Sequence, residues 1–520
     1  MKQRTKGLIM FIFLGGIMVT SGVLVALPGI IPSELQSTQQ TVTGTPADNF
    51  PDAQRVQFCS TGDAQSGRYI TEYKIPTACT QPLAIKVDPQ GTVWFAQTNT
   101  GNIASFEPSS KVFTEFENDA WPKSARSMIW GMDYSPDNSM WYTDDAYDTL
   151  WKFSIMDEEY SRIAYADGDA FPQKIQVDGS SLVINDFSGA RISFIEQAVQ
   201  KGIPAQFISI PSPLQESFAS DFALDGGYVW YANWIHKGEG ALVRFDRDKY
   251  ENDAMKNNTL DVYIKTIDLP EKIQTPNGVT IGPQGHVWIA DTSSSSLYRF
   301  DKQTDTFTEY VTLPPPLSSY GNATGLILDP ISRPYWIETD GEILVFNEQT
   351  GNRIGVLYPA ESKLIEYLIP STNPNWGDCG VAFNCGLAQA FGFDIYGDKV
   401  WFTEWVENNI GVLDLSKKLP LDVKFDSKTL EIKNNESNNI QLSISPLGDT
   451  AEVVKISYNV PVDGIIMTFD EKPFPVDELV TANVKVFVNE MVPKGTYKVI
   501  IGVDTGDVAI SEYIDIIVRS

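Results

Sequence analysis

The distribution of hydrophobic and polar positions repeats one motif along the chain. A short apolar run leads into a turn rich in Gly, Asp and Pro, and a second run containing an aromatic residue follows. The clearest copies are PLAIKVDPQGTVWFAQ (82–97), PNGVTIGPQGHVWIAD (276–291) and GFDIYGDKVWFTEW (392–405). Such paired runs predict β-hairpins. Residues 56–417 are therefore expected to be a series of repeated hairpin units.

The aromatic position of the second run marks each copy. The markers are Trp94, Trp141, Val183, Trp230, Trp288, Trp336 and Trp401, the third copy having lost its tryptophan. Their mean separation of about 51 residues suits a four-stranded blade with its loops, so the pattern predicts a seven-bladed β-propeller. The last copy lacks a fourth strand, whereas residues 68–76 have the same pattern before the first copy. We expect this N-terminal strand to complete the last blade.

Two further segments flank the repeat. After residue 417 the repeat stops, and about seven short alternating strands predict a β-sandwich over residues 418–520. Its KGTYKVIIGV stretch resembles the immunoglobulin-like modules appended to exported prokaryotic proteins, a likeness that concerns the fold alone. Residues 32–55 are rich in Ser, Thr, Gln and Pro and predict a flexible stalk.

The N-terminus has the pattern of a membrane segment. Lys2, Arg4 and Lys6 precede 25 uncharged positions, 7–31. This run is long enough to cross a bilayer, and no clear cleavage site follows it, so residues 1–31 are predicted to be an uncleaved transmembrane helix. The basic N-terminal flank predicts a single-pass protein of the cell membrane with its bulk extracellular. A cleaved signal peptide, giving a secreted protein, remains the alternative.

Composition narrows the class of partner. The chain has 39 Lys and Arg against 67 Asp and Glu, a net charge of −28, which excludes nucleic acid as a partner. Hydrophobic residues make up 42%, too many for a disordered acidic chain. The expected partners are therefore a small molecule, a glycan or a surface protein, with membrane contact only through the N-terminal helix.

Four cysteines form two sequence-local pairs, which in an exported chain favour disulfides. We expect Cys59–Cys79 and Cys379–Cys385. A zinc site made of all four is the alternative, but neither pair has C-x-x-C spacing.

Oxygen-bearing residues recur at the end of each second run. They are Gln97, Asp144, Asp186, Asn233, Asp291, Glu338 and Glu404. Antiparallel pairing places each opposite the start of its first run, as with Asn277 and Asp291, so these residues are expected to ring one mouth of the central channel. We predict Asn277 and Asp291 as ligands for Mg²⁺ or Ca²⁺, with Trp130, Asp144, Asp186, Asn233, Glu338 and Glu404 as ligand-binding residues. Alternatively, each carboxylate accepts backbone N–H bonds in the next turn and recurs only because the fold repeats.

Only two histidines are present. His286 follows a hairpin turn and is expected to be structural. His236 lies just beyond Asn233 on the predicted mouth side, and it is the candidate catalytic residue. An ordinary loop histidine is the alternative for His236.

The repeat P-x-G/A-[IV]-x-[IVF]-x-P-x-G-x-[VL]-W-F-[TA]-E, followed by N-x-I-G, resembles the streptogramin B lyase (virginiamycin B lyase) family over about residues 68–415. WFTEWVENNIGVLD (401–414) is among its nearest stretches. The resemblance implies a seven-bladed propeller that opens a cyclic depsipeptide by elimination, using Mg²⁺, glutamates and a histidine base in a P-H-[AG]-I segment. Asn277 stands in place of that histidine here, and no copy contains P-H. PNG also resembles the metal-binding segment of gluconolactonase-like propellers, which implies Ca²⁺ or Mg²⁺ at Asn277.

Two functions follow as expectations. In the first, a membrane-anchored extracellular propeller binds its partner at an acidic axial mouth and catalyses no reaction. In the second, it is a metal-assisted lyase or lactonase acting on a cyclic ester. Asn277 and Asp291 would then hold the cation, and His236 or a carboxylate of raised pKa would act as the base.

Overall fold

The computed structural model describes residues 59–121, 127–165, 170–197, 207–210, 212–235, 238–253, 260–315, 332–374, 386–469 and 472–519. The predicted anchor (1–31) and stalk (32–55) lie outside these ranges. Within them, no helix has the length and apolar character needed to cross a membrane. The described chain is almost entirely β, apart from helix α4 (Arg247–Asn252) and two single-turn 3-10 helices, η1 (Leu260–Tyr263) and η2 (Pro283–Gly285).

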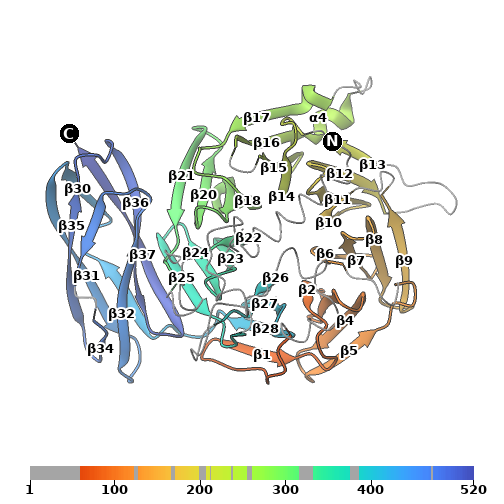
Figure 1. Cartoon of the computed structure of the whole chain (residues 1–520), viewed down its shortest axis with the longest axis horizontal. Coiled ribbons are helices and arrows are strands. Elements are labelled where there is room, and N and C mark those ends of the chain that lie inside the picture. Colours follow the sequence, from red (N-terminus) through yellow and green to blue (C-terminus); the bar gives the residue numbers. More distant parts are fainter. Residues whose placement is uncertain are drawn as a thin grey trace, which may run out of the picture.

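Seven four-stranded antiparallel units, here called blades, follow one another around a ring (Figure 1). The first strand of each blade lies nearest the axis and the fourth lies outermost. Blades 1 to 4 are β2 (Pro82–Val87), β3 (Val93–Gln97), β4 (Asn102–Glu107) and β5 (Val112–Phe116); β6 (Met132–Ser135), β7 (Ser139–Asp144), β8 (Thr149–Ser154) and β9 (Glu159–Ala164); β10 (Pro172–Asp178), β11 (Ser181–Asp186), β12 (Arg191–Glu196) and β13 (Phe207–Ile210); β14 (Phe218–Asp225), β15 (Tyr228–Trp234), β16 (Gly240–Asp246) and β17 (Ile264–Asp268).

The last blade combines both ends of the ring. Blades 5 to 7 are β18 (Pro276–Ile281), β19 (Val287–Asp291), β20 (Ser296–Asp301) and β21 (Thr306–Val311); β22 (Pro334–Asp340), β23 (Ile343–Glu348), β24 (Arg353–Tyr358) and β25 (Lys363–Leu368); β26 (Ala390–Tyr396), β27 (Lys399–Glu404), β28 (Asn409–Asp414) and β1 (Ile70–Lys74). Strand β1 pairs with β28, Ile70 opposite Leu413. This confirms that the N-terminal strand completes the last blade, which removes two exposed strand edges.

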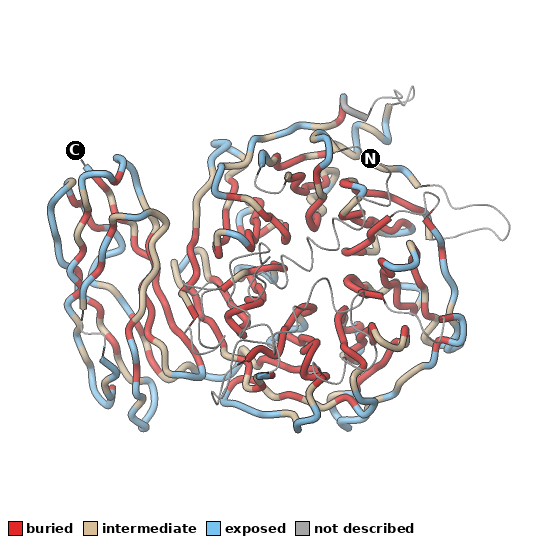
Figure 2. Tube along the Cα trace, in the orientation of Figure 1, coloured by how far each residue is buried: buried red, intermediate tan, exposed pale blue. Residues whose placement is uncertain are grey.

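The repeated aromatic residues pack between neighbouring blades. Trp94 of blade 1 shares a buried cluster with Tyr142 and Phe153 of blade 2, and Trp288 of blade 5 shares one with Leu344 of blade 6. Burial is densest on these inner and inter-blade surfaces, as Figure 2 shows. The aromatic residue therefore repeats because each blade must fill the same wedge against the next one.

The glycine of the repeat marks a close approach between inner strands. A Cβ added at Gly278 of β18 would lie 2.6 Å from the carbonyl oxygen of Tyr335 in β22, and one at Gly392 of β26 would collide with the carbonyl oxygen of Leu83 in β2. A side chain at either position would push two blades apart. The glycine of PNG is thus explained by packing near the axis.

The C-terminal domain continues the sheet of blade 6. Strand β25 pairs with β37 (Val508–Arg519), which is followed by β36 (Gly495–Asp504), β32 (Glu452–Asn459) and β34 (Phe474–Val476), while β30 (Thr429–Lys433) pairs in parallel with β37. A second sheet contains β29 (Leu421–Phe425), β31 (Glu436–Pro446), β35 (Val480–Val488) and β33 (Ile465–Thr468). The two sheets enclose an apolar core, in agreement with the predicted sandwich. Its likeness to immunoglobulin modules stays a prediction.

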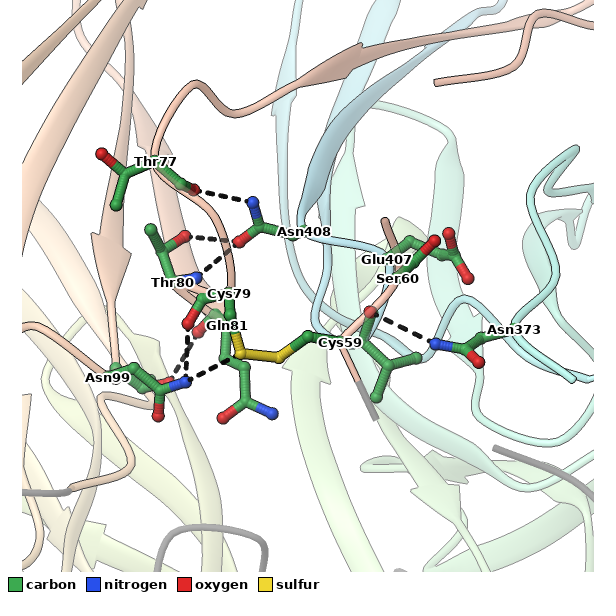
Figure 3. Close-up of a disulfide and its surroundings, with 12 residues drawn as sticks. Cys59, Ser60, Thr77, Cys79, Thr80, Gln81, Asn99, Asn373, Glu407 and Asn408 are labelled. Carbon is green, nitrogen blue, oxygen red and sulfur yellow. Dashed lines mark hydrogen bonds between the residues drawn. A yellow bond between two sulfur atoms is a disulfide. The ribbon is translucent and has the colours of Figure 1, made fainter. Parts of the chain in front are cut away.

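One disulfide joins Cys59 to Cys79, with the two Cα atoms 5.3 Å apart (Figure 3). Ser60 N–H donates to the carbonyl of Val406, and Asn408 accepts from Thr80 N–H and hydroxyl at 2.7 Å each. The disulfide therefore lies where blade 7 meets blade 1, beside the N-terminal strand. This predicted pair is confirmed, whereas Cys379 and Cys385 lie outside the described residues.

Candidate functional site

The predicted collar of oxygen-bearing residues lies at the ends of the second strands, and it is buried. Gln97, Asp144, Asp186, Asn233, Asp291 and Glu404 are all fully inaccessible to solvent. Asp186 accepts from the backbone N–H groups of Phe171 and Gly189 at 2.8 and 2.9 Å and from Arg191 Nε at 2.9 Å. This is the structural alternative stated for the pattern: the carboxylate closes the following turn and fixes the loop that enters the blade.

Asp291 has the same kind of environment. Its carboxylate accepts from the backbone N–H groups of Gln274, Thr275 and Ser294 at 3.1, 2.6 and 2.9 Å. Burial raises its pKa to about 6. Asn277 does not face it: a bulge places Pro276 opposite Asp291, and the Asn277 amide donates to Thr292 at 2.6 Å. The described residues contain no cluster of three or more His, Cys, Asp or Glu that could hold a metal ion.

The other collar residues also bond inside the blades. Asp144 accepts from Ser127 Oγ at 2.5 Å and from Trp151 Nε1 at 2.9 Å, while the Asn233 amide donates to the carbonyl of Phe218 at 3.1 Å. Glu404 accepts from Asn409 at 2.8 Å. Burial, followed by the charge of nearby Glu72, raises the pKa of Glu404 well above its ordinary value.

The predicted register of blade 6 is wrong. Trp336 was expected on the second strand with Glu338 at its end, but both residues lie on the innermost strand, β22. The second strand ends at Glu348, which pairs with Pro334 and is the true equivalent of Asp291. The error arose because blade 6 has Val345 at the marker position and tryptophan on its first strand instead.

The structure places one of the two histidines. His236 lies outside the described residues. His286 follows the turn η2 between β18 and β19, where its carbonyl accepts from Gly282 N–H at 2.9 Å, and burial lowers its pKa. It does not line the axial cavity described below.

Aromatic side chains meet across the axis at the level of the collar. Trp130 of blade 2 stacks on Tyr335 of blade 6 with ring centroids 6.2 Å apart, and it meets Phe391 of blade 7 edge-on at 5.6 Å. All three are buried. Trp130, a predicted ligand-binding residue, also donates from Nε1 to Asp145 at 3.2 Å, so it is held on both sides.

A cavity of about 370 Å³ lies on the axis, lined by residues of all seven inner strands. It contains one residue per blade at the position paired with the marker of the second strand. The seven pairs are Lys86 with Trp94, Asp133 with Trp141, Gln176 with Val183, Ala223 with Trp230, Thr280 with Trp288, Glu338 with Val345 and Asp394 with Trp401.

Five charged side chains line this cavity: Lys86, Asp133, Lys174, Glu338 and Asp394. Asp221 does not line it but is buried behind Lys174, to which it is paired, and the six residues together are here called the axial cluster. Lys86 lies between Asp394 and Asp133, with Nζ to carboxylate distances of 2.8 and 3.6 Å. Lys174 lies 3.3 Å from Asp221 and reaches across the ring to Glu338 at 3.4 Å. Four carboxylates therefore face only two ammonium groups.

The carboxylates of the axial cluster also hold the blades together. Asp394 of blade 7 accepts from Val87 N–H of blade 1 at 2.8 Å, and Asp133 of blade 2 accepts from Val177 N–H of blade 3 at 2.7 Å. The cluster is thus fixed by the scaffold, which preorganises it for a ligand.

Burial and charge shift the pKa values of the cluster. Burial raises the pKa of Asp221 to about 6 and also raises those of Asp133 and Glu338, although the lysines oppose this change. Burial disfavours the Lys86 and Lys174 ammonium groups, but the neighbouring carboxylates outweigh it and raise both pKa values. Both lysines are therefore protonated at neutral pH, and the excess of carboxylate makes the cavity prefer additional positive charge.

Sequence reasoning identified Glu338 but missed the other five members. A signal for three of them was present, because Lys86, Asp133 and Asp394 directly oppose their blade's tryptophan marker. Lys174 and Asp221 lie in bulges, which alter the pairing register at these positions. No signal in the sequence locates those bulges.

Neither a protein-family model nor a curated protein matches the sequence. Among solved structures, the chain is similar to virginiamycin B lyase from Staphylococcus aureus, with a TM-score of 0.51 and 19% identity over 66% of this chain and 99% of that one. The same values apply to a catalytically inactive histidine-to-alanine variant of that enzyme with quinupristin, and a streptogramin B lyase structure matches at 0.51 and 19% over 67% and 99%. The fold is a β-propeller. At this identity the likeness concerns the fold alone.

Proposed function

We propose that the protein binds a small, positively charged molecule in the axial cavity. The observation that supports this best is the composition of the axial cluster, in which four carboxylates share two lysines; three of the carboxylates line the cavity of about 370 Å³ and the fourth, Asp221, lies behind Lys174. A cavity of this size lies at the small end of the range of ligand pockets. The excess of two carboxylates would complement one or two amino groups.

The raised pKa values of Asp133, Asp221 and Glu338 support a cationic ligand. They mean that these carboxylates bind a proton more tightly in the folded protein than in water. An ammonium group placed beside these carboxylates would provide the same compensation without protonating them. Binding is therefore expected to strengthen as pH rises through about 6, the pKa of Asp221, and to release protons.

Accessibility within the cluster indicates which groups would touch the ligand. The side chains of Lys86, Lys174 and Glu338 are 31%, 26% and 29% exposed, whereas Asp221 is fully buried. Lys174 also lies 6.0 Å above the ring of Trp336, which lines the cavity. A ligand amine would compete with Lys174 for Glu338 and for this aromatic face.

We also propose that the propeller is displayed outside the cell and anchored through residues 1–31. The Cys59–Cys79 disulfide supports export, because such bonds persist in oxidising compartments. The apolar run of the anchor is a property of the sequence.

Calorimetry on the purified full-length protein in detergent tests the binding function. At pH 7.5, 1,4-diaminobutane is expected to bind and 1,4-butanediol, its neutral analogue, is not. Glu338→Gln should weaken binding of the diamine by about tenfold or more, as for loss of a charged hydrogen bond. Glu431→Gln, on the exposed surface of the C-terminal domain, is the matched control. Equal binding of diol and diamine, or an unaffected Glu338→Gln, would contradict the proposal.

A second candidate is catalysis in the same cavity on a cyclic ester. The observation in its favour is Asp221, a buried carboxylate beside Lys174 whose pKa of about 6 suits a proton acceptor near neutral pH. This candidate would also require Mg²⁺ or Ca²⁺ bound by Asn277 and Asp291, the ligands that the sequence predicts. Incubation with a cyclic depsipeptide and with a simple lactone, with and without Mg²⁺ or Ca²⁺, tests this candidate; no ring opening in any mixture would reject it.

A further inference from the structure

A second cavity, of about 590 Å³, lies between blade 5 and the C-terminal domain. One wall is formed by β20 and β21 of the propeller, the other by β36 of the C-terminal domain, and the β24–β25 turn contributes Pro359 and Ser362. We refer to it as the interdomain cleft. The cleft exists only because the two parts of the chain are joined, so it is absent from a propeller alone.

The two walls are held rigidly. Strands β25 and β37 pair over five residues, Lys363 opposite Glu512 through Tyr367 opposite Val508. The Tyr513 hydroxyl donates to the carbonyl of Val311 at 2.9 Å, and the Asn459 amide donates to that of Thr312 at 2.8 Å. The cleft is therefore preformed rather than assembled by a ligand.

The interdomain cleft carries excess positive charge in a strongly acidic protein. Lys272 is paired with Glu309 at 2.9 Å, and Lys498 with Asp515 at 2.8 Å. The third cation, Arg299 of β20, has no ion pair or hydrogen bond among the described residues, and its Nε is buried without a partner. Arg299 lines the cleft, and a guanidinium can bind a carboxylate through two parallel hydrogen bonds.

Blade 4 also has an arginine at the position of Arg299, and there the side chain packs against an aromatic ring. Arg244 of β16 is the equivalent residue, since it pairs with Trp230 as Arg299 pairs with Trp288. Arg244 stacks 4.6 Å over the ring of Tyr228, and its Nε is likewise buried without a hydrogen-bond partner, so the ring contact and the cleft distinguish the two arginines. Arg299 has no such ring contact in the described part of the chain, and it lines the cleft instead.

We propose that the interdomain cleft binds a sugar that bears a carboxylate. Arg299 would hold the carboxylate, the half-buried rings of Phe307 and Tyr497 offer apolar faces, and the hydroxyls of Thr308 and Thr496 can bond to sugar hydroxyls. The site gives the C-terminal domain a role in recognition. It is independent of the axial cavity, because the two share no lining residue.

Titration calorimetry with sodium glucuronate tests this site on the full-length protein, with glucose and sodium sulfate as comparison ligands. Glucuronate is expected to bind, glucose at least about tenfold more weakly, and Arg299→Gln should lower glucuronate affinity by about tenfold or more. Arg244→Gln is the matched control and should bind normally. Thr496→Glu, an exposed change on the other wall, should also abolish binding while leaving the fold intact.

Several outcomes would overturn the proposal: glucose binding as tightly as glucuronate, Arg299→Gln binding like the wild type, or Arg244→Gln losing as much affinity as Arg299→Gln. Sulfate binding with no glucuronate binding would show a general anion site and reject the sugar. Glu338→Gln, which removes an axial carboxylate, should leave glucuronate binding unchanged, so failure at one cavity is distinguishable from failure at the other.

Discussion

Replacing Asp221 by asparagine should change how the stability of the protein depends on pH. Asp221 is fully buried, and burial raises its pKa from an ordinary 3.8 to about 6. Because the folded-state pKa is the higher one, the stability contributed by Asp221 is fully present below about pH 4 and is lost as pH rises through about 6. Asparagine at this position cannot ionise, so the variant does not lose stability through this site as pH rises.

The size of the effect follows from the pKa values. Moving a pKa from 3.8 to about 6 corresponds to about 3 kcal/mol, because each tenfold change in an ionisation constant is worth about 1.36 kcal/mol. About half of this change should occur between pH 5 and pH 8, a range that stays above the pI of 4.4 and its risk of precipitation. Over that range, Asp221→Asn should therefore gain about 1–2 kcal/mol of stability relative to the wild type.

The assay is guanidinium unfolding followed by tryptophan fluorescence at pH 5, 6, 7 and 8. Each variant is compared with the wild type at the same pH, so that other titrating groups cancel. Glu431→Gln is the control, since this side chain is exposed and far from the axis. Parallel pH profiles for the wild type and Asp221→Asn would refute the reasoning, because they would mean that Asp221 titrates alike in the folded and unfolded chain.

Three further predictions concern the scaffold. Asp186→Ala should lower the free energy of unfolding by about 3 kcal/mol or more in a guanidinium titration, because two backbone N–H groups and Arg191 lose their buried acceptor; an unchanged midpoint would contradict its structural role. Gly392→Val should abolish the folded protein as judged by soluble yield, while Gly397→Ala, whose added Cβ meets nothing within 4 Å, should fold despite its positive φ; equal yields would contradict the close packing of inner strands. Replacing Cys59 and Cys79 by serine should cost about 2–4 kcal/mol, and a thermal midpoint unaffected by the double change would show that the disulfide does not stabilise the joint between blades 7 and 1.

Much of the fold could be predicted from the sequence, because hairpin periodicity and the aromatic marker are local signals. The spacing of the marker residues was enough to predict seven units, and the unpaired strand pattern at residues 68–76 was enough to predict that β1 completes the last blade. The predicted register of blade 6 was wrong for a physical reason. Val345 occupies the marker position of the second strand, and Trp336, the predicted marker of this blade, belongs to the innermost strand.

The candidate site was harder to predict. The ends of the second strands carry repeated carboxylates and amides that resemble a binding site in the sequence, but these side chains are buried in the structure. Carboxylates such as Asp291 recur there to close turns, a role that looks like a ligand collar when only the sequence is read. The accessible charges lie farther along the inner strands, at residues such as Lys86 and Glu338. Their meeting across the ring is a long-range property, and the pairing of Lys174 with Glu338 spans 164 residues.

The central claim is that an excess of carboxylate at the axial cluster binds a small cation. Calorimetric titration of the full-length protein with 1,4-diaminobutane at pH 6, repeated in buffers of different ionisation enthalpy, tests it most directly. Because Asp221 is partly protonated at this pH, the account predicts saturable binding with net release of protons, a release that Asp221→Asn reduces. Binding without proton release, or no binding of the diamine at any pH between 6 and 8, would contradict the claim.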